Sequence, residues 1–288
     1  MGADANAGIG ALFSWGGRVS INKRLDEARR AFAKGDQAAT AAAHDFRRIA
    51  HATHEKHGGG GAQYIGDLVY GGLDGIVTTF AVVSGVAGAN LGTGVILILG
   101  LANLFADGFS MATGAYLSAK SEQEYYEQER ARERYEVEHF PDGERAELYE
   151  LYRARGYSDE EAGQLVAIHS RDTERWVDAM MIDELQMLRN EGNPLKNGLA
   201  TLLAFIVAGS VPLLIYLAGL VVPVPANTAF PISVILSALA LFGLGAAKVR
   251  VTGQRPLRSG LEMLLIGGLA AAVAYVIGAL LRGLGLQG

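Results

Sequence analysis

The chain has 288 residues, half of them hydrophobic and 19% charged, and its mean hydropathy is +0.20. These values are too apolar for an ordinary soluble domain and indicate an integral membrane protein with a water-exposed part. Cysteine is absent, which excludes disulfides, thiol nucleophiles and iron–sulfur clusters, so a metal ion would have to bind carboxylates, imidazoles, carbonyls or thioethers. The formal charge is −5, with the acidic residues concentrated between 122 and 191, and nucleic acid is therefore not an expected partner.

Residues 1–62 are expected to form a basic amino-terminal extension, with one or two amphipathic helices between 21 and 57 and a glycine linker at 58–61. No cleavable signal peptide is expected, because the apolar stretch at 9–19 is short and interrupted by two glycines. The extension carries four histidines: His44, His51, His54 and His57. Imidazoles three residues apart can share a metal ion, but a polar tail that binds nothing explains the cluster equally well.

Five apolar stretches reach the roughly 20 residues that a transmembrane helix needs. They lie at about 67–89, 92–118, 197–220, 229–248 and 260–281. Lysine and arginine occur before the first stretch, between the second and third, and between the fourth and fifth. The positive-inside rule therefore places the amino terminus and these connecting segments in the cytoplasm.

The predicted fold is an all-α membrane protein, with transmembrane helices 1 and 2 at 63–119, a cytoplasmic helical metal-binding domain at 120–192, and transmembrane helices 3–5 at 193–288. The first two spans are rich in glycine, which predicts close helix packing or an intersubunit contact. Pro212 predicts a kink in the third span, and the outer loop after it is expected to contain Pro223, Pro225 and Pro231.

The first two spans carry polar side chains at helical spacing. Asp67 and Asp74 are nearly two turns apart and share one helix face. Asn103, Asp107 and Met111 form a stripe at i, i+4 and i+8. A carboxylate in hydrocarbon is costly and usually marks an ion pathway, so these five residues are the candidate transport pathway. Alternatively, Asp67 marks the membrane interface and Met111 is core filler.

The insert is expected to contain helices at about 118–138, 142–155, 158–169 and 171–190. Ser158 followed by Glu161 is a capping-box pattern and predicts the start of the third helix. The candidate metal ligands of the insert are glutamates on three of these helices, together with two methionines: Glu129, Glu133, Glu136, Glu144, Glu147, Glu184, Met180 and Met181.

Several features of these glutamates favour a binding site for first-row divalent metals. Like charges at i, i+3 and i, i+4 repel unless a cation neutralises them. Glu184 lies between Met180 and Met187 on one predicted face, and thioether with carboxylate is a donor set that suits such ions. The alternative is a solvated, salt-bridged surface, because arginines are interspersed at 130, 132 and 134.

Three stretches carry a resemblance to a known family. They are Gly66-Asp67 through Leu73-Asp74-Gly75, then Ser110-Met111 with 114–122, and the run from Trp176 to Leu185. With these stretches the chain resembles the vacuolar iron transporter family of divalent metal/proton antiporters, over about residues 64–285.

The resemblance implies a homodimer with five membrane helices per chain, a cytoplasmic helical metal-binding domain, and a pathway at the dimer interface. It implies that Asp74 and Met111 line the pathway and that Asp67 lies near its cytoplasmic mouth. By position, the family's metal-domain ligands fall on Glu133, Glu136, Glu144, Glu147 and Glu184, with Met180 or Met181 as the soft ligand.

The sequence departs from the family pattern in two places. Plant members have a glutamate where this chain has Asn103, and Asp107 one turn later would supply the missing charge. The amino-terminal extension is longer than the core family needs, and with only Glu27 and Glu55 available it cannot build the ferritin-like di-iron domain of some bacterial relatives.

The sequence thus predicts a secondary active transporter and not an enzyme, one that exports Fe2+, and Mn2+ or other first-row divalent ions, from the cytoplasm in exchange for protons. No permanent cofactor is expected; the expected partners are the transported ion, regulatory metal ions in the cytoplasmic domain, membrane lipid and a second copy of the chain. The membrane would be vacuolar in a eukaryote and the inner (plasma) membrane in a prokaryote. The alternative is a membrane-anchored carboxylate metal-binding or oxidase protein without transport.

Overall fold

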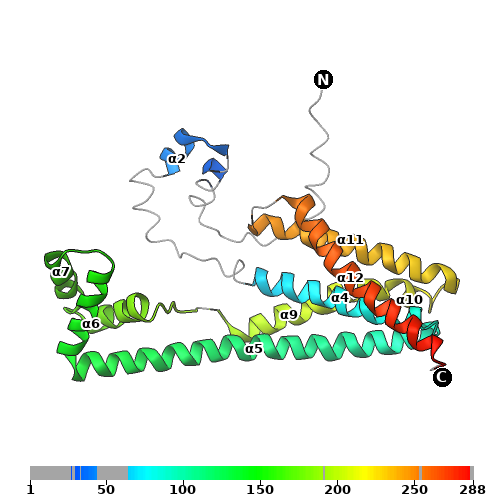
Figure 1. Ribbon diagram of the computed structural model, residues 1–288, viewed down its shortest axis with the longest axis horizontal. Helices are drawn as coiled ribbons and strands as arrows, with labels where there is room; N and C mark the ends of the chain where they lie inside the picture. The colour runs from blue at the N-terminus through cyan, green and yellow to red at the C-terminus, as the bar shows by residue number, and fades with distance from the viewer. Residues whose placement is uncertain are drawn as a thin grey trace. The chain divides into compact units, whose positions relative to one another are not determined.

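The computed structural model describes residues 27, 30–32, 34–43, 64–190, 192–252 and 255–285. The chain divides into two compact units, residues 1–66 and 67–288 (Figure 1). In the first unit the helix α2 (Gln37–Ala43) falls in the region where amphipathic helices were expected. The four histidines of the predicted cluster lie outside the described residues.

The second unit is built from helices, and no described residue is in a β-strand. Its elements in chain order are α4 (Ile65–Gly88), α5 (Thr93–His139), α6 (Pro141–Ala154), α7 (Asp159–His169), α8 (Thr173–Ala179), η1 (Met180–Glu184), α9 (Pro194–Gly209), η2 (Val211–Leu213), α10 (Leu214–Ala218), α11 (Ala226–Thr252) and α12 (Pro256–Gly283). Five helical segments in the described part of the chain are long and apolar enough to cross a membrane: α4, α5, α9 to α10, α11 and α12. The predicted all-α class and the five spans are therefore confirmed.

Close helix packing at glycines is also confirmed, and it occurs within the chain. A Cβ on Gly71 of α4 would lie 2.8 Å from the carbonyl oxygen of Thr201 in α9. At its other end α4 meets α12, where a Cβ on Gly85 would contact the backbone of Ala274. The helix α9 also packs along α5, and α12 packs along α11. Glycine at these positions lets the helix backbones approach closely, which is the usual role of small residues in membrane helix interfaces.

Proline acts differently at its two positions in the later spans. Pro212 interrupts the third span as predicted, because it lies in the short 3-10 segment η2 between α9 and α10. The Ser233 hydroxyl of α11 donates a hydrogen bond of 2.7 Å to the Pro212 carbonyl oxygen, which satisfies a buried polar group at the kink. Pro231 was expected in the outer loop, but it lies inside α11, in its second turn, where it removes one helical hydrogen bond.

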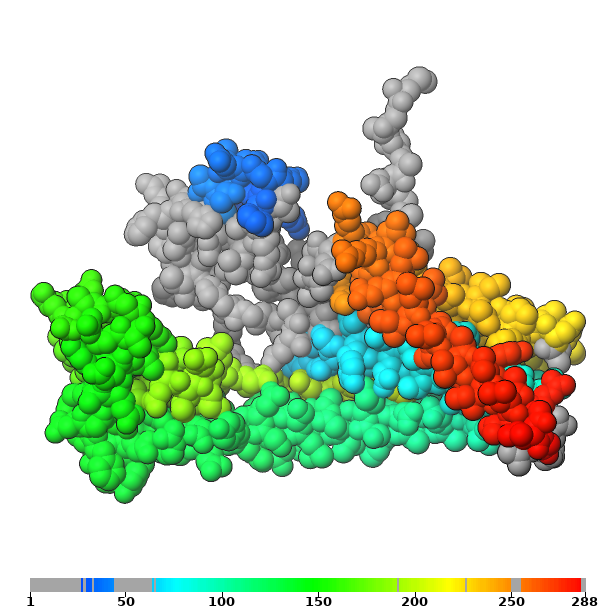
Figure 2. Space-filling model, viewed as in Figure 1, coloured from blue at the N-terminus to red at the C-terminus, as the bar shows by residue number. Residues whose placement is uncertain are grey.

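The helix α5 joins the membrane part to the insert. The second span and the first insert helix were expected as separate elements, but they form one helix of 47 residues, about 70 Å long at 1.5 Å per residue. The hydrocarbon core is only about 30 Å thick, and charged residues become dense from Lys120 onward. The apolar half at 93–119 is therefore the candidate membrane-spanning part. The remainder of α5 extends to the helices of the insert (Figures 1 and 2).

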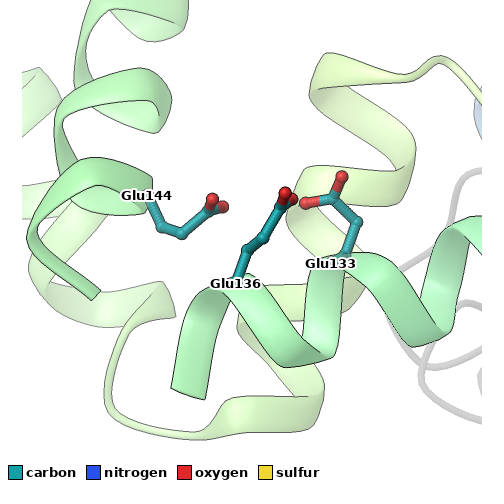
Figure 3. Close-up of side chains that lie close together, drawn as sticks. All are labelled: Glu133, Glu136 and Glu144. Atoms are coloured by element: carbon teal, nitrogen blue, oxygen red, sulfur yellow. The ribbon is translucent and has the colours of Figure 1, made fainter. Parts of the chain in front are cut away.

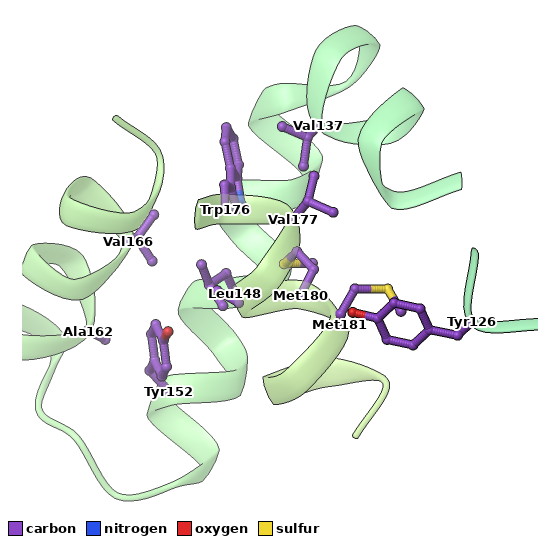
Figure 4. Close-up of a cluster of buried hydrophobic side chains, with 11 residues drawn as sticks. Tyr126, Val137, Leu148, Tyr152, Ala162, Val166, Trp176, Val177, Met180 and Met181 are labelled. Atoms are coloured by element: carbon purple, nitrogen blue, oxygen red, sulfur yellow. The ribbon is translucent and has the colours of Figure 1, made fainter. Parts of the chain in front are cut away.

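The insert packs around its own apolar core. Buried side chains from α5, α6, α7, α8 and η1 form it: Tyr126, Val137, Leu148, Tyr152, Ala162, Val166, Trp176, Val177, Ala179, Met180 and Met181 (Figure 4). The capping box at Ser158 and Glu161 is present and starts α7. The predicted helix at 171–190 was too long, since it ends with the π-helical turn η1 and non-helical chain follows from Leu185.

Candidate functional site

Three glutamates from α5 and α6 converge in the insert. Glu133 and Glu136 lie one turn apart near the end of α5, and Phe140 is the single residue between α5 and α6. Pro141 begins α6 and turns the chain back, so that Glu144 faces the α5 pair (Figure 3). One carboxylate oxygen from each of Glu133, Glu136 and Glu144 lies within 4.8 Å of the other two. We call these three residues the carboxylate cluster.

Two members of the cluster, Glu133 and Glu144, are buried and poorly supplied with hydrogen-bond donors. Glu133 is 1% exposed and Glu144 is 5% exposed. Neither oxygen of Glu133 accepts a hydrogen bond from a described residue, and Oε2 of Glu144 likewise accepts none. Buried carboxylates without donors are costly and are usually explained by an ion, a proton or a functional role.

Burial shifts the pKa values of the two buried glutamates. Burial raises the pKa of the Glu133 carboxyl to about 7, although the nearby Arg132 opposes the rise. Burial, together with the charge of Glu133, raises the pKa of Glu144 to about 7. A divalent cation would neutralise the repulsion, and because it must displace protons near neutral pH, its binding would release them.

The other predicted glutamates lie around the cluster. Glu147 is exposed on α6 and interacts electrostatically with Glu133 and Glu144. Glu184 closes η1; burial raises its pKa, and its Oε2 is buried without a hydrogen bond from the described part of the chain. Glu129 is half-buried and pairs with Arg132 at 3.0 Å. The structure thus gathers glutamates from α5, α6 and η1 in one electrostatic neighbourhood.

The methionines lie in the apolar core. Met180 and Met181 are both fully buried, among Leu148, Val177 and their neighbours (Figure 4). The expected helical face shared by Met180, Glu184 and Met187 does not form, because η1 replaces the α-helix and Met187 follows its end. The role of Met180 or Met181 as a soft ligand stays a prediction.

The membrane residues are also brought together. Asp67 and Met111 line one cavity of about 370 Å³ at the junction of α4, α5 and α9. Deeper in the membrane helices, Asp74 and Asp107 lie within electrostatic range of each other. All four side chains are half-buried, as is Asn103, whose Nδ2 has no acceptor among the described residues. The polar faces predicted for the first two spans therefore meet between α4 and α5.

Sequence reasoning missed some residues of this arrangement. Tyr70, Ser110 and Thr201 line the same cavity as Asp67. A lone threonine or tyrosine in an apolar run has no spacing that distinguishes it, so only the packing of α9 could reveal Thr201. Sequence reasoning also treated Arg132 as one of three equivalent arginines, but it forms an ion pair with Glu129. The spacing of three residues between Glu129 and Arg132 could have predicted this pair.

The described part of the chain defines a multi-pass membrane protein whose helical insert holds a buried carboxylate cluster. The family model described as the VIT family matches residues 65–279. The chain belongs to the VIT family.

The chain is similar to several named proteins. It is 38% identical to the vacuolar iron transporter of Toxoplasma gondii (strain ATCC 50861 / VEG) over 276 residues, covering 92% of this chain and 91% of the relative. It is 32% identical to the vacuolar iron transporter of Plasmodium falciparum (isolate 3D7), covering 91% and 98%. It is 34% identical to vacuolar iron transporter 1 of Arabidopsis thaliana, covering 77% and 88%. The higher coverage means that similarity to the first two proteins extends into residues 1–62.

Proposed function

We propose that the protein exports Fe2+, and Mn2+ or related first-row divalent ions, from the cytoplasm across a membrane in exchange for protons. The observation that carries the proposal is the meeting of Asp67 with Met111 and of Asp74 with Asp107 inside apolar helices. Carboxylates at such positions are costly unless they bind a proton or a cation. The names of the relatives, which are vacuolar iron transporters, support iron as the ion.

Shared ligands explain the coupling. The carboxylate cluster collects the metal ion from the cytoplasm and releases protons as it binds. The ion then enters the cavity at Asp67 and moves along α4 and α5 past Met111, Asp74 and Asp107. A proton arriving from an acidic far side displaces the ion, because proton and metal compete for the same carboxylate oxygens. The Met111 thioether favours Fe2+ and Mn2+ over harder ions such as Mg2+ and Ca2+.

The proposal also includes an oligomeric state and a membrane for the protein. A homodimer would place the pathway between two copies of α4 and α5, with lipid covering the remaining apolar surface. The lysines and arginines of the insert and of the loop before α12 favour a cytoplasmic position for both. The vacuolar names of the relatives favour a vacuolar membrane.

Ion flux in proteoliposomes with an acidic lumen tests the pathway. Asp74→Asn removes a carboxylate from the apolar helices while keeping the side-chain shape, and we expect proton-driven Fe2+ flux to be lost. The matched control is Asp142→Asn, the same substitution at a fully exposed aspartate, and it should leave flux unchanged. Full flux in Asp74→Asn would reject this pathway.

Calorimetry with the purified chain tests the collector. Glu144→Ala combined with Glu147→Ala should weaken divalent metal binding strongly. Glu138→Ala combined with Glu150→Ala, two exposed glutamates of α5 and α6, should not. An unchanged isotherm in the first pair would remove the collector role.

The carboxylate cluster also keeps one rival function open, that of a membrane-anchored metal-binding or oxidase protein without transport. Three carboxylates within 4.8 Å could hold a metal pair. The insert has one Glu-x-x-His element, Glu136 to His139, and not the pair typical of di-iron oxidases. Oxygen consumption on adding Fe2+, with no ion flux in proteoliposomes, would favour the rival.

A further inference from the structure

Arg132 lies among the glutamates of the insert and contacts three of them. Its guanidinium is 3.0 Å from Oε2 of Glu129, 2.6 Å from Oε1 of Glu133 and 2.5 Å from Oε2 of Glu136. The three carboxylates and the arginine occupy positions 129, 132, 133 and 136, which form one stripe along α5. Two of the three partners belong to the carboxylate cluster.

The neighbouring arginines of α5 do something different. Arg130 pairs with Glu174 and Asp178, and Arg134 pairs with Glu174. These partners lie on α8, so both arginines fasten α8 to α5. Arg132 and Arg134 are similarly exposed, at 42% and 45%, so they differ in what they contact and not in their access to water.

The contact between Arg132 and Glu133 is incomplete. The two charged groups are 2.6 Å apart, yet neither oxygen of the 1% exposed Glu133 accepts a hydrogen bond from the described residues. A guanidinium normally satisfies a carboxylate through aligned N–H donors. Glu133 is therefore charge-compensated but not satisfied by hydrogen bonds, and one of its oxygens points toward the Glu136 carboxylate (Figure 3).

A guanidinium and a divalent ion would compete for these oxygens. Arginine keeps its positive charge at all physiological pH values, so it cannot leave by losing a proton. A metal ion that binds Glu133 and Glu136 must displace the guanidinium or lie beside its charge, and both cost free energy. The cost is moderate, because Arg132 is partly exposed and its charge is screened by water.

We propose that Arg132 is an internal counter-cation that neutralises the carboxylate cluster before metal binds and yields Glu133 and Glu136 to the incoming ion. It thereby lowers metal affinity and favours release of the ion toward the membrane pathway. The inference rests on the proposed collector function and names the residue that sets its affinity.

Metal affinity of the purified full-length chain tests the proposal. Mn2+ is titrated calorimetrically at pH 7.5 into chelator-stripped protein. Arg132→Gln removes the competing charge, and we expect the Kd for Mn2+ to fall about fivefold, which corresponds to an ion-pair network of moderate strength. Arg134→Gln is the matched control, since it removes the same charge two residues away, and its Kd should stay at the wild-type value.

A purely structural role for Arg132 gives the opposite result. If the arginine only holds the insert together, Arg132→Gln would leave the Kd unchanged or raise it. Arg132→Met keeps the apolar stem without the charge, so it should reproduce the fall in Kd and serves as the second variant if the glutamine variant does not fold. An unchanged or higher Kd in the folded variant overturns the proposal.

The outcomes separate this inference from the proposed function. If wild-type protein binds Mn2+ and the Glu144→Ala, Glu147→Ala variant does not, while Arg132→Gln binds as wild type does, only the role of Arg132 fails. If wild-type protein binds no Mn2+, the collector function fails and the inference fails with it.

Discussion

Two glutamates of the insert are buried, in surroundings where a charged carboxylate is costly. Glu133 and Glu144 are buried, and each has at least one oxygen that accepts no hydrogen bond within the described residues. A protein that needed these positions only for packing would be more stable with neutral side chains there. Keeping charged groups in such surroundings is typical of functional sites, where the ligand supplies the missing stabilisation.

This arrangement predicts an unusual pH dependence of stability. The pKa of both carboxyls is raised to about 7 in the folded state, above the ordinary value of 4.5. Between these values the folded state binds more protons than the unfolded state, so the stability of the metal-free protein should fall as pH rises from 5 to 8. Unfolding followed by Trp176 fluorescence in a Trp15→Phe background would measure this, because Trp176 is buried in the insert core.

The substitution Glu133→Gln should separate stability from binding. It removes the buried charge and keeps the shape, so the metal-free protein should unfold at a higher temperature than wild type at pH 8, with a flatter pH dependence. The same variant should lose affinity for Mn2+. The exposed Glu138→Gln is the control and should change neither property. A destabilised Glu133→Gln protein at pH 8 would contradict the assignment of an unsatisfied charge.

In the pairs of membrane helices, glycine allows the two backbones to approach closely. The α4 and α9 backbones meet at Gly71 and Thr201 with no room for a methyl group. This contact holds α9 against the face of α4 that carries Asp67, and Thr201 lines the cavity of Asp67. Packing and the candidate pathway therefore depend on the same helix contact.

Adding a methyl group at this contact should destabilise the membrane part. In Gly71→Ala the new Cβ would lie 2.8 Å from the Thr201 carbonyl oxygen, and overpacking of this kind typically costs about 1–3 kcal/mol. Gly94→Ala is the matched control, because nothing lies within 4 Å of its Cβ. Thermal unfolding of the detergent-solubilised protein should show a lower midpoint for Gly71→Ala only; equal midpoints would mean that the helices can separate without loss.

At the scale of the second unit, α5 is the element that joins the carboxylate cluster to the candidate pathway residues. The same helix carries Asp107 and Met111 in its apolar half and Glu133 and Glu136 near its end. Met111 and Glu133 are 22 residues apart, about 33 Å along an α-helix. A continuous helix holds this distance and orientation constant, whereas a flexible linker would not.

Breaking α5 between these two regions should uncouple them. Glu124 is exposed and precedes the candidate metal ligands, which begin at Glu129. Glu124→Pro would remove a helical hydrogen bond and bend the helix. We expect ion flux in proteoliposomes to fall several-fold while Mn2+ affinity stays at the wild-type value. Glu124→Ala is the control and should preserve both. Normal flux in Glu124→Pro would show that the continuity of α5 is unimportant for transport.

Much of this protein was determined by the sequence alone. The length and apolarity of five segments are properties of composition, so the spans at residues 67–281 could be predicted without tertiary information. The capping box at Ser158 is local for the same reason. The end of the predicted helix at 190 was wrong because no proline or glycine marks the chain at 185, where the π-helical turn η1 and the packing of the insert end the helix.

Tertiary structure alone decided which charges meet. Periodicity placed Glu133 and Glu136 on one face, but only the turn at Phe140 and Pro141 brought Glu144 to them. Likewise, the positions of Asp74 and Asp107 were readable within each span. Only the packing of α4 against α5 brings the two side chains within electrostatic range of each other. Local sequence sets helices and their faces because those depend on neighbours along the chain; contacts between faces depend on how the helices fold together.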